Sequence, residues 1–135
     1  MGRIRNNAAA ESGQAMVEMA LLLPMLMVLV LGIAQFGVIF NNYETLTDAT
    51  RVGARQAILL RIDGGDPNSA AQVVKDASKS LNWTQPGATV TVTSPDWTTP
   101  GTDVTVTATY PYSINLLGWV VASGNLSSVQ VERLE

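Results

Sequence analysis

The chain has 135 residues, enough for one small domain, and any residues that cross a membrane leave fewer for a water-soluble core. Eight Lys and Arg residues against eleven Asp and Glu residues give a net charge of −3, and no basic run follows the first residues, so we expect no nucleic-acid partner. The sequence contains no His and no Cys, and no spacing of Asp, Glu, Ser or Lys residues singles out a catalytic pair. We therefore expect no enzyme activity, no catalytic residues, no metal site and no cofactor.

Residues 19–40 form an uncharged apolar segment in which only Gln35 is strongly polar. A helix of these 22 residues is about 33 Å long at about 1.5 Å per residue, which is enough to cross the hydrocarbon layer of a bilayer. Pro24 lies inside the segment and can kink the helix, because proline has no N–H for the helical hydrogen bond. The segment therefore predicts one transmembrane helix.

A cleaved secretory signal is an alternative interpretation of the same segment. Arg3 and Arg5 would form its basic end, and cleavage near Ala34 would release a soluble binding domain. The sequence stays apolar as far as Phe40, which favours a retained membrane anchor. Arginine residues lie near both ends of the segment, so charge alone leaves its orientation open.

A single helix is expected to continue from about residue 16 to residue 62, because no strong helix breaker follows the apolar segment before this point. Beyond the apolar segment it carries an amphipathic stripe and, on the same side, a line of small residues that would let another backbone approach closely. The stripe can seat the chain's own head or contact a partner helix. The stripe contains Tyr43, Leu46, Thr50, Ala54 and Ile58, and the small-residue line contains Ala49, Gly53 and Ala57.

The remainder predicts a small head with one helix and about three antiparallel strands. Asp66 and Pro67 are typical of a helix start, and the helix is expected over residues 67–81. Alternating Val and Thr residues predict strands over 88–94 and 103–112, and a third strand closes the chain from residue 126. Residues 113–125 are expected to be an apolar connection that covers the sheet or contacts a neighbour. The expected fold class is α+β.

The stretch SGQAMVEMALLLP, with Gly13 five residues before Glu18 at the start of an apolar helix, resembles the processing site of type IV pilin-like precursors. Together with LTDATRVGARQA in the stalk, VTVTATYPYSI in the head and the terminal VERLE, it is similar to the TadE-like family of tight-adherence pilus proteins. The resemblance implies that Gly13 ends a leader of residues 1–13 and that Gln14 begins the mature chain. It implies a pilin-like long helix over 14–62, with its transmembrane part at 19–40, and an extracytoplasmic head over 63–135.

The resemblance also implies how the protein is placed and what it contacts. The expected topology is a single membrane pass with a cytoplasmic N-terminus, followed by incorporation into an extracellular pilus for surface attachment. The implied partners are other pilin subunits, a prepilin peptidase, the pilus assembly machinery and the membrane.

Glu18 would pair with the new amino group of Gln14 on a neighbouring subunit, or it is simply a carboxylate favoured in a first helical turn. A membrane-anchored scaffold that never polymerises is a further alternative. The residues expected to act in assembly are Glu18, Pro24, Ala49, Gly53 and Ala57.

Overall fold

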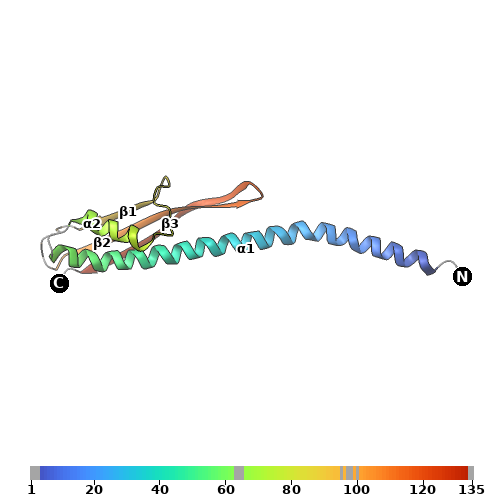
Figure 1. The fold of residues 1–135 in the computed structure, drawn as a ribbon, viewed down its shortest axis with the longest axis horizontal. Coiled ribbons are helices and arrows are strands. Elements are labelled where there is room, and N and C mark those ends of the chain that lie inside the picture. The colour runs from blue at the N-terminus through green and yellow to red at the C-terminus, as the bar shows by residue number, and fades with distance from the viewer. Residues whose placement is uncertain (1–3, 63–65, 95, 97–98, 100, 134–135) are drawn as a thin grey trace.

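The computed structural model describes residues 4–62, 66–94, 96, 99 and 101–133, and it consists of one long helix with a small head beside one end of it (Figure 1). The long helix is α1, Ile4–Ile62, and the head contains the short helix α2, Pro67–Ala77. Three strands complete the head: β1, Thr89–Thr93; β2, Asp103–Leu116; and β3, Trp119–Arg133. The expected α+β class, with a long N-terminal helix and a head of one helix and three antiparallel strands, is confirmed.

Helix α1 contains 59 residues and is therefore about 90 Å long. It begins at Ile4, about twelve residues before the expected start. Leu, Met and Ala residues, which favour helices, fill much of its length, and Pro24 lies inside it without ending it. Figure 1 shows a curved rod whose C-terminal part lies beside the head and whose N-terminal part extends well beyond it.

The three strands form an antiparallel sheet in the order β1-β2-β3. In its register Val92 pairs with Val106, and Val106 also pairs with Gln130. Because paired residues share a face of the sheet, one face carries the Val side chains of β1 and β2, here called the Val face, and the other carries their Thr side chains. On β3 the order is reversed: Val129 and Val131 lie on the Thr side and are exposed. The Val face is buried, as the alternation predicts, and its most buried members are Val104, Val106, Ala108 and Tyr110.

The connection between β2 and β3 differs from the expected one. Instead of a covering segment over residues 113–125, the two strands continue toward each other until Leu116 pairs with Trp119. The turn consists of Leu117 and Gly118, with φ of 51° and 90°. Two successive positive φ angles match the twist of a tight hairpin, and glycine adopts this geometry without steric cost. The expectation of a separate connection is wrong because Leu117 gave no sequence signal for such a turn.

The hydrophobic core lies between α1, α2 and the Val face of the sheet. Helix α2 starts as expected, with the Asp66 carboxylate accepting a hydrogen bond from the Ser69 N–H at 2.9 Å. It ends at Ala77 rather than near residue 81, because Ser78 leaves helical geometry. The buried apolar residues are Leu46, Ala49, Ala54, Ala57, Ala70, Val74, Leu81, Val104, Val106, Ala108 and Tyr110.

Polar contacts attach the segment after α2 to the sheet. The Trp83 indole N–H donates to Ser78 Oγ at 3.1 Å, and the Tyr110 hydroxyl accepts from the Asn82 N–H at 3.2 Å. The rings of Trp83 and Tyr110 meet edge to face with centroids 6.0 Å apart. These contacts hold the head together as a unit against the C-terminal part of α1.

Candidate functional site

The part of α1 at residues 13–40, here called the free half, carries apolar side chains that are mostly exposed, and it meets β2 only near its C-terminal end, at Gln35, Val38 and Ile39. Met16, Leu21 and Met25 are 75%, 74% and 72% exposed. The consecutive residues 21–23 are all exposed, so the apolar surface surrounds the helix rather than forming one stripe. Among the described residues α1 is the one helix long and apolar enough to cross a membrane. Such a surface is stable in a lipid bilayer or among other apolar helices, and it is unfavourable in water.

Gly13 and Gln14 lie on an uninterrupted stretch of helix at the start of the free half. A Cβ atom added to Gly13 would meet nothing within 4 Å, so no contact inside the subunit requires glycine there. Glycine inside a helix costs about 1 kcal/mol relative to alanine. The fold of the subunit therefore gives no reason for glycine at position 13.

Glu18 is exposed one turn further along α1, and because α1 begins at Ile4, Glu18 does not lie in the first turn of the helix, as the alternative interpretation expects. Its Oε1 atom accepts a hydrogen bond from Nε2 of Gln14 at 3.4 Å, an ordinary contact between residues four apart on a helix. The carboxylate thus lies at the edge of the apolar surface, next to the position at which the resemblance places the first mature residue.

Pro24 lies inside the free half and interrupts its hydrogen bonding. Its ring nitrogen has no hydrogen to donate to the carbonyl oxygen of Ala20, four residues earlier. One helical bond is therefore missing, and α1 bends more easily at this point than elsewhere.

The small-residue line lies in the C-terminal part of α1, residues 41–62, here called the covered part, and contacts the chain's own head. Ala49 and Ala57 are buried, and a Cβ atom on Gly53 would lie 2.2 Å from Cγ2 of Val74 in α2. The carbonyl oxygen of Ala70 would lie 3.6 Å from the same atom. The close helix approach that the small residues predict therefore exists, and within the described chain α2 is the helix that makes it.

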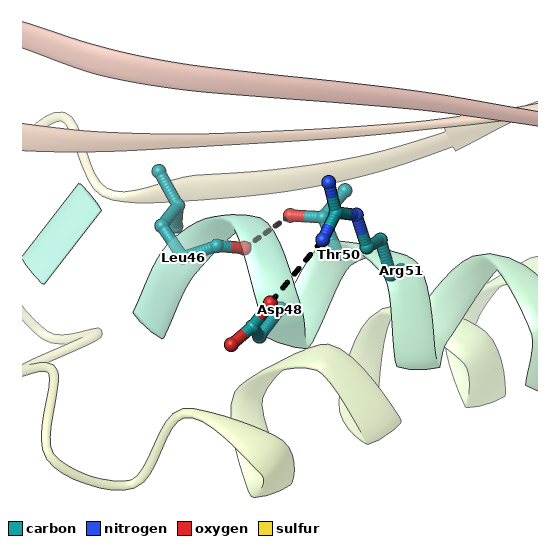
Figure 2. Close-up of polar contacts among 4 residues, drawn as sticks. All are labelled: Leu46, Asp48, Thr50 and Arg51. Atoms are coloured by element: carbon teal, nitrogen blue, oxygen red, sulfur yellow. Dashed lines mark hydrogen bonds and ion pairs between the residues drawn. The ribbon is translucent and has the colours of Figure 1, made fainter. Parts of the chain in front are cut away.

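The opposite sides of the covered part have different characters. Figure 2 shows Leu46 and Thr50 on the side of the strands, where Thr50 Oγ1 donates to the Leu46 carbonyl oxygen at 2.6 Å. Asp48 and Arg51 form an exposed ion pair with an N–O distance of 3.5 Å. This part of α1 is amphipathic, as the sequence predicts, and its apolar side is already occupied from Leu46 onward. Tyr43, the first residue of the predicted stripe, is instead 43% exposed.

Gln35 is a functional candidate to which the sequence assigns no role. Its Oε1 atom accepts a hydrogen bond from the Asn115 N–H at 2.8 Å, and its Nε2 atom donates to the Asn115 carbonyl oxygen. The side chain thus joins the free half of α1 to the backbone of β2, 80 positions later. Its isolation in an apolar segment is the signal that could have revealed it, because a polar group in such a segment needs a partner.

A groove of about 490 Å³ runs along this junction between α1 and β2. Its walls are apolar and aromatic with a few amides, and it contains no charged side chain. In the part of the chain that the structure describes, no three Asp or Glu residues gather as they would around a metal ion. The lining residues are Gln35, Val38, Ile39, Asn42, Gln85, Pro86, Tyr110, Pro111, Tyr112 and Ser113.

Comparison with known proteins identifies one family. The family model described as TadE-like protein matches residues 13–55, which begin at Gly13 and include the apolar segment, Glu18, Pro24 and most of the small-residue line. Neither the search of curated proteins nor that of solved structures returns a match. The family and the apolar helix together fit a membrane-anchored protein associated with the Tad pilus machinery. The match confirms the resemblance for residues 13–55, which are similar to the TadE-like family; the head motifs VTVTATYPYSI and VERLE lie outside the matched residues.

Proposed function

We propose that the protein is a structural, non-enzymatic subunit of a tight-adherence pilus, either a minor pilin or a filament subunit that serves surface attachment. The observation that carries this proposal is the apolar surface of the free half of α1, which surrounds the helix and is uncovered. In the membrane this surface contacts lipid. In a filament it packs against the same segment of other subunits, so one surface serves both states without refolding the head.

We propose that the leader is residues 1–13 and that a prepilin peptidase cuts between Gly13 and Gln14. Two observations support this site: Gly13 has no packing role in the subunit, and the family match begins at this residue. The N-terminus would lie in the cytoplasm and the head, residues 63–135, outside. The pilus assembly machinery would then extract the mature subunit into the filament.

Glu18 would act in assembly. Cleavage would convert the peptide nitrogen of Gln14 into a free amine, which carries a positive charge near neutral pH. Among packed apolar helices, a carboxylate is stable only when it is neutralised or paired. A pair between Glu18 of one subunit and the Gln14 amine of the next would meet this requirement and would fix the axial position of the helices. Pro24 would let the helices bend as they pack, and the small-residue line would hold the head in place on the stalk.

The first test is the mass of the mature protein isolated from cells. Cleavage after Gly13 leaves 122 residues, and because the leader carries two Arg residues and one Glu residue, the net charge changes from −3 to −4. Gly13→Leu should block the cut. A chain that begins at Met1 would contradict processing at this site, and a chain that begins after Ala34 would support a secreted domain instead. A correctly processed chain that never appears in pili would support a membrane-anchored scaffold.

A further inference from the structure

The tip of the β2-β3 hairpin carries a cluster of exposed apolar side chains. Trp119 is 82% exposed, Leu117 70% and Val120 64%. No charged residue occurs from residue 104 to residue 131. The hairpin is therefore uncharged except at its open end, where β2 begins and β3 ends. Exposed apolar residues clustered in this way mark a contact surface. The tip consists of Leu116, Leu117, Gly118, Trp119, Val120 and Val121.

The hairpin lies along α1 and points toward its N-terminal, apolar end (Figure 1). The two hydrogen bonds between Gln35 and the Asn115 backbone fix its position along the helix. Gln35 is about 25 Å from Glu18 along the helix axis, and a hydrocarbon layer is about 30 Å thick. When Glu18 lies at one boundary of this layer, Gln35 and the hairpin tip lie at the depth of the opposite boundary.

The turn itself keeps an apolar side chain at the outermost position. Leu117 has a φ of 51°, a region that Gly, Asn and Asp occupy far more readily than leucine. A hairpin selected only for its turn would carry Asn or Gly there. Leucine at this position is unfavourable for the turn and unfavourable in water, and both observations point to an apolar environment around the tip.

We propose that the hairpin tip inserts into the outer boundary of the lipid bilayer beside α1 and forms a second membrane contact. Trp119 suits this position because an indole ring favours the membrane–water interface. The hairpin can enter this layer because its strands pair with each other as far as Leu116 and Trp119, which satisfies many of their peptide groups. The contact sets how deeply α1 sits and holds the head upright on the membrane.

The inference rests on the membrane anchoring in the proposed function, and the test separates the two. The chain has no Cys, so single cysteines can be introduced into the full chain and labelled with the environment-sensitive fluorophore NBD. Val120→Cys reports on the tip and Leu29→Cys on the free half of α1. Val129→Cys is the matched control: it is an exposed valine of the same strand, 53% exposed, about 30 Å farther from the tip. The proteins are reconstituted into phosphatidylcholine vesicles with and without brominated acyl chains.

We expect the brominated lipid to quench the labels at positions 29 and 120 at least about twofold and to leave the label at 129 unchanged. Gln35→Leu should reduce quenching at 120 and leave quenching at 29 intact, because it removes both bonds to Asn115. Quenching at 29 without quenching at 120 would overturn the hairpin contact and leave the anchor standing. No quenching at 29 would overturn the anchor itself. A blue shift at 120 that grows with protein density, without lipid quenching, would show that a second copy covers the tip and would also overturn the proposal.

Discussion

The two parts of α1 have opposite relations to the rest of the chain. From residue 41 onward, small and apolar residues recur on one side and are buried under α2 and the sheet, with Leu46, Ala54 and Ala57 fully buried. In the free half apolar residues occupy every side, and Leu21, Met25 and Phe36 remain more than 60% exposed. One continuous helix thus contains a part that is packed along one side within the subunit and a part that, apart from Gln35 and its neighbours against β2, is left uncovered.

Because of this difference, substitutions in the two parts of α1 should change different properties of the protein. In the covered part, a change of side-chain volume acts on the free energy of unfolding of the head, because the packing is intramolecular and dense. In the free half, the same change acts on insertion or assembly and leaves the head unaffected. The predictions below test this division, beginning with the largest expected effect.

Gly53→Leu should cause the largest loss of stability. Even the first added carbon would lie 2.2 Å from Val74 Cγ2, so α2 must move away from α1. We expect a destabilisation of about 3 kcal/mol, measured by thermal unfolding of the head in detergent. Gly37→Leu is the matched control, because a Cβ atom there meets nothing within 4 Å, and since leucine favours a helix more than glycine does, it should not lower the unfolding free energy. Equal effects of the two substitutions would contradict the division of α1.

Glu18→Ala should leave the head and membrane insertion intact and reduce incorporation into filaments. We expect the ratio of filament-associated to membrane-bound protein to fall about tenfold, which corresponds to a charge pair worth about 1.4 kcal/mol. Glu44→Ala serves as the control, since Glu44 is an exposed glutamate in the covered part of the same helix. If the ratio is unchanged while processing is complete, Glu18 is an ordinary exposed carboxylate and not an assembly residue.

Asp66→Ala should cause a smaller loss, which depends on pH. The hydrogen bond from the Ser69 N–H lowers the pKa of the Asp66 carboxyl below its ordinary value of 3.8. A lowered pKa stabilises the fold at pH values above 3.8, and this contribution disappears as the pH falls through the folded-state pKa. The melting temperature of the variant should therefore lie below that of the parent at pH 7, and the difference should narrow at about pH 2. A difference that stays constant with pH would contradict a role for the charged cap.

Asp48→Asn should have the smallest effect. The ion pair with Arg51 is exposed to water, and such pairs contribute at most a few tenths of a kcal/mol. Chemical denaturation should give the same midpoint for variant and parent within error. A clear shift would mean that this side of α1 is covered by a contact outside the subunit.

The fold class, the long helix and the buried face of the sheet could be predicted because they depend on local patterns. The 3.6-residue period of the stalk and the two-residue period of the strands place Leu46 and Val106 in the core without knowledge of the partner element. Which helix packs on the small-residue line could not be predicted, since a partner helix and the chain's own α2 both satisfy the same spacing. Only the three-dimensional position of Val74 identifies α2.

The hairpin tip and Gln35 were missed for a different physical reason. The turn uses Leu117 in a conformation that leucine rarely adopts, so the local preference of the residue opposes the observed structure. The partner of Gln35 is a backbone group on a strand 80 positions away, and side-chain pairing over such a separation leaves no periodic pattern in the sequence.

The assembly and processing roles of Gly13, Gln14, Glu18 and Pro24 stay predictions, because they concern contacts outside the subunit.

Cross-linking in assembled pili tests the division of α1 most directly. Leu29 is 58% exposed in the free half, and Lys79 is exposed in the head. Because the chain has no native cysteine, Leu29→Cys and Lys79→Cys can be compared as two separate single-cysteine variants, the second as the control. With a short thiol cross-linker, the account predicts covalent dimers through position 29 in purified filaments and few or none through position 79. Filaments that contain the Leu29→Cys protein but yield no dimer through that position would contradict an assembly interface on the free half of α1.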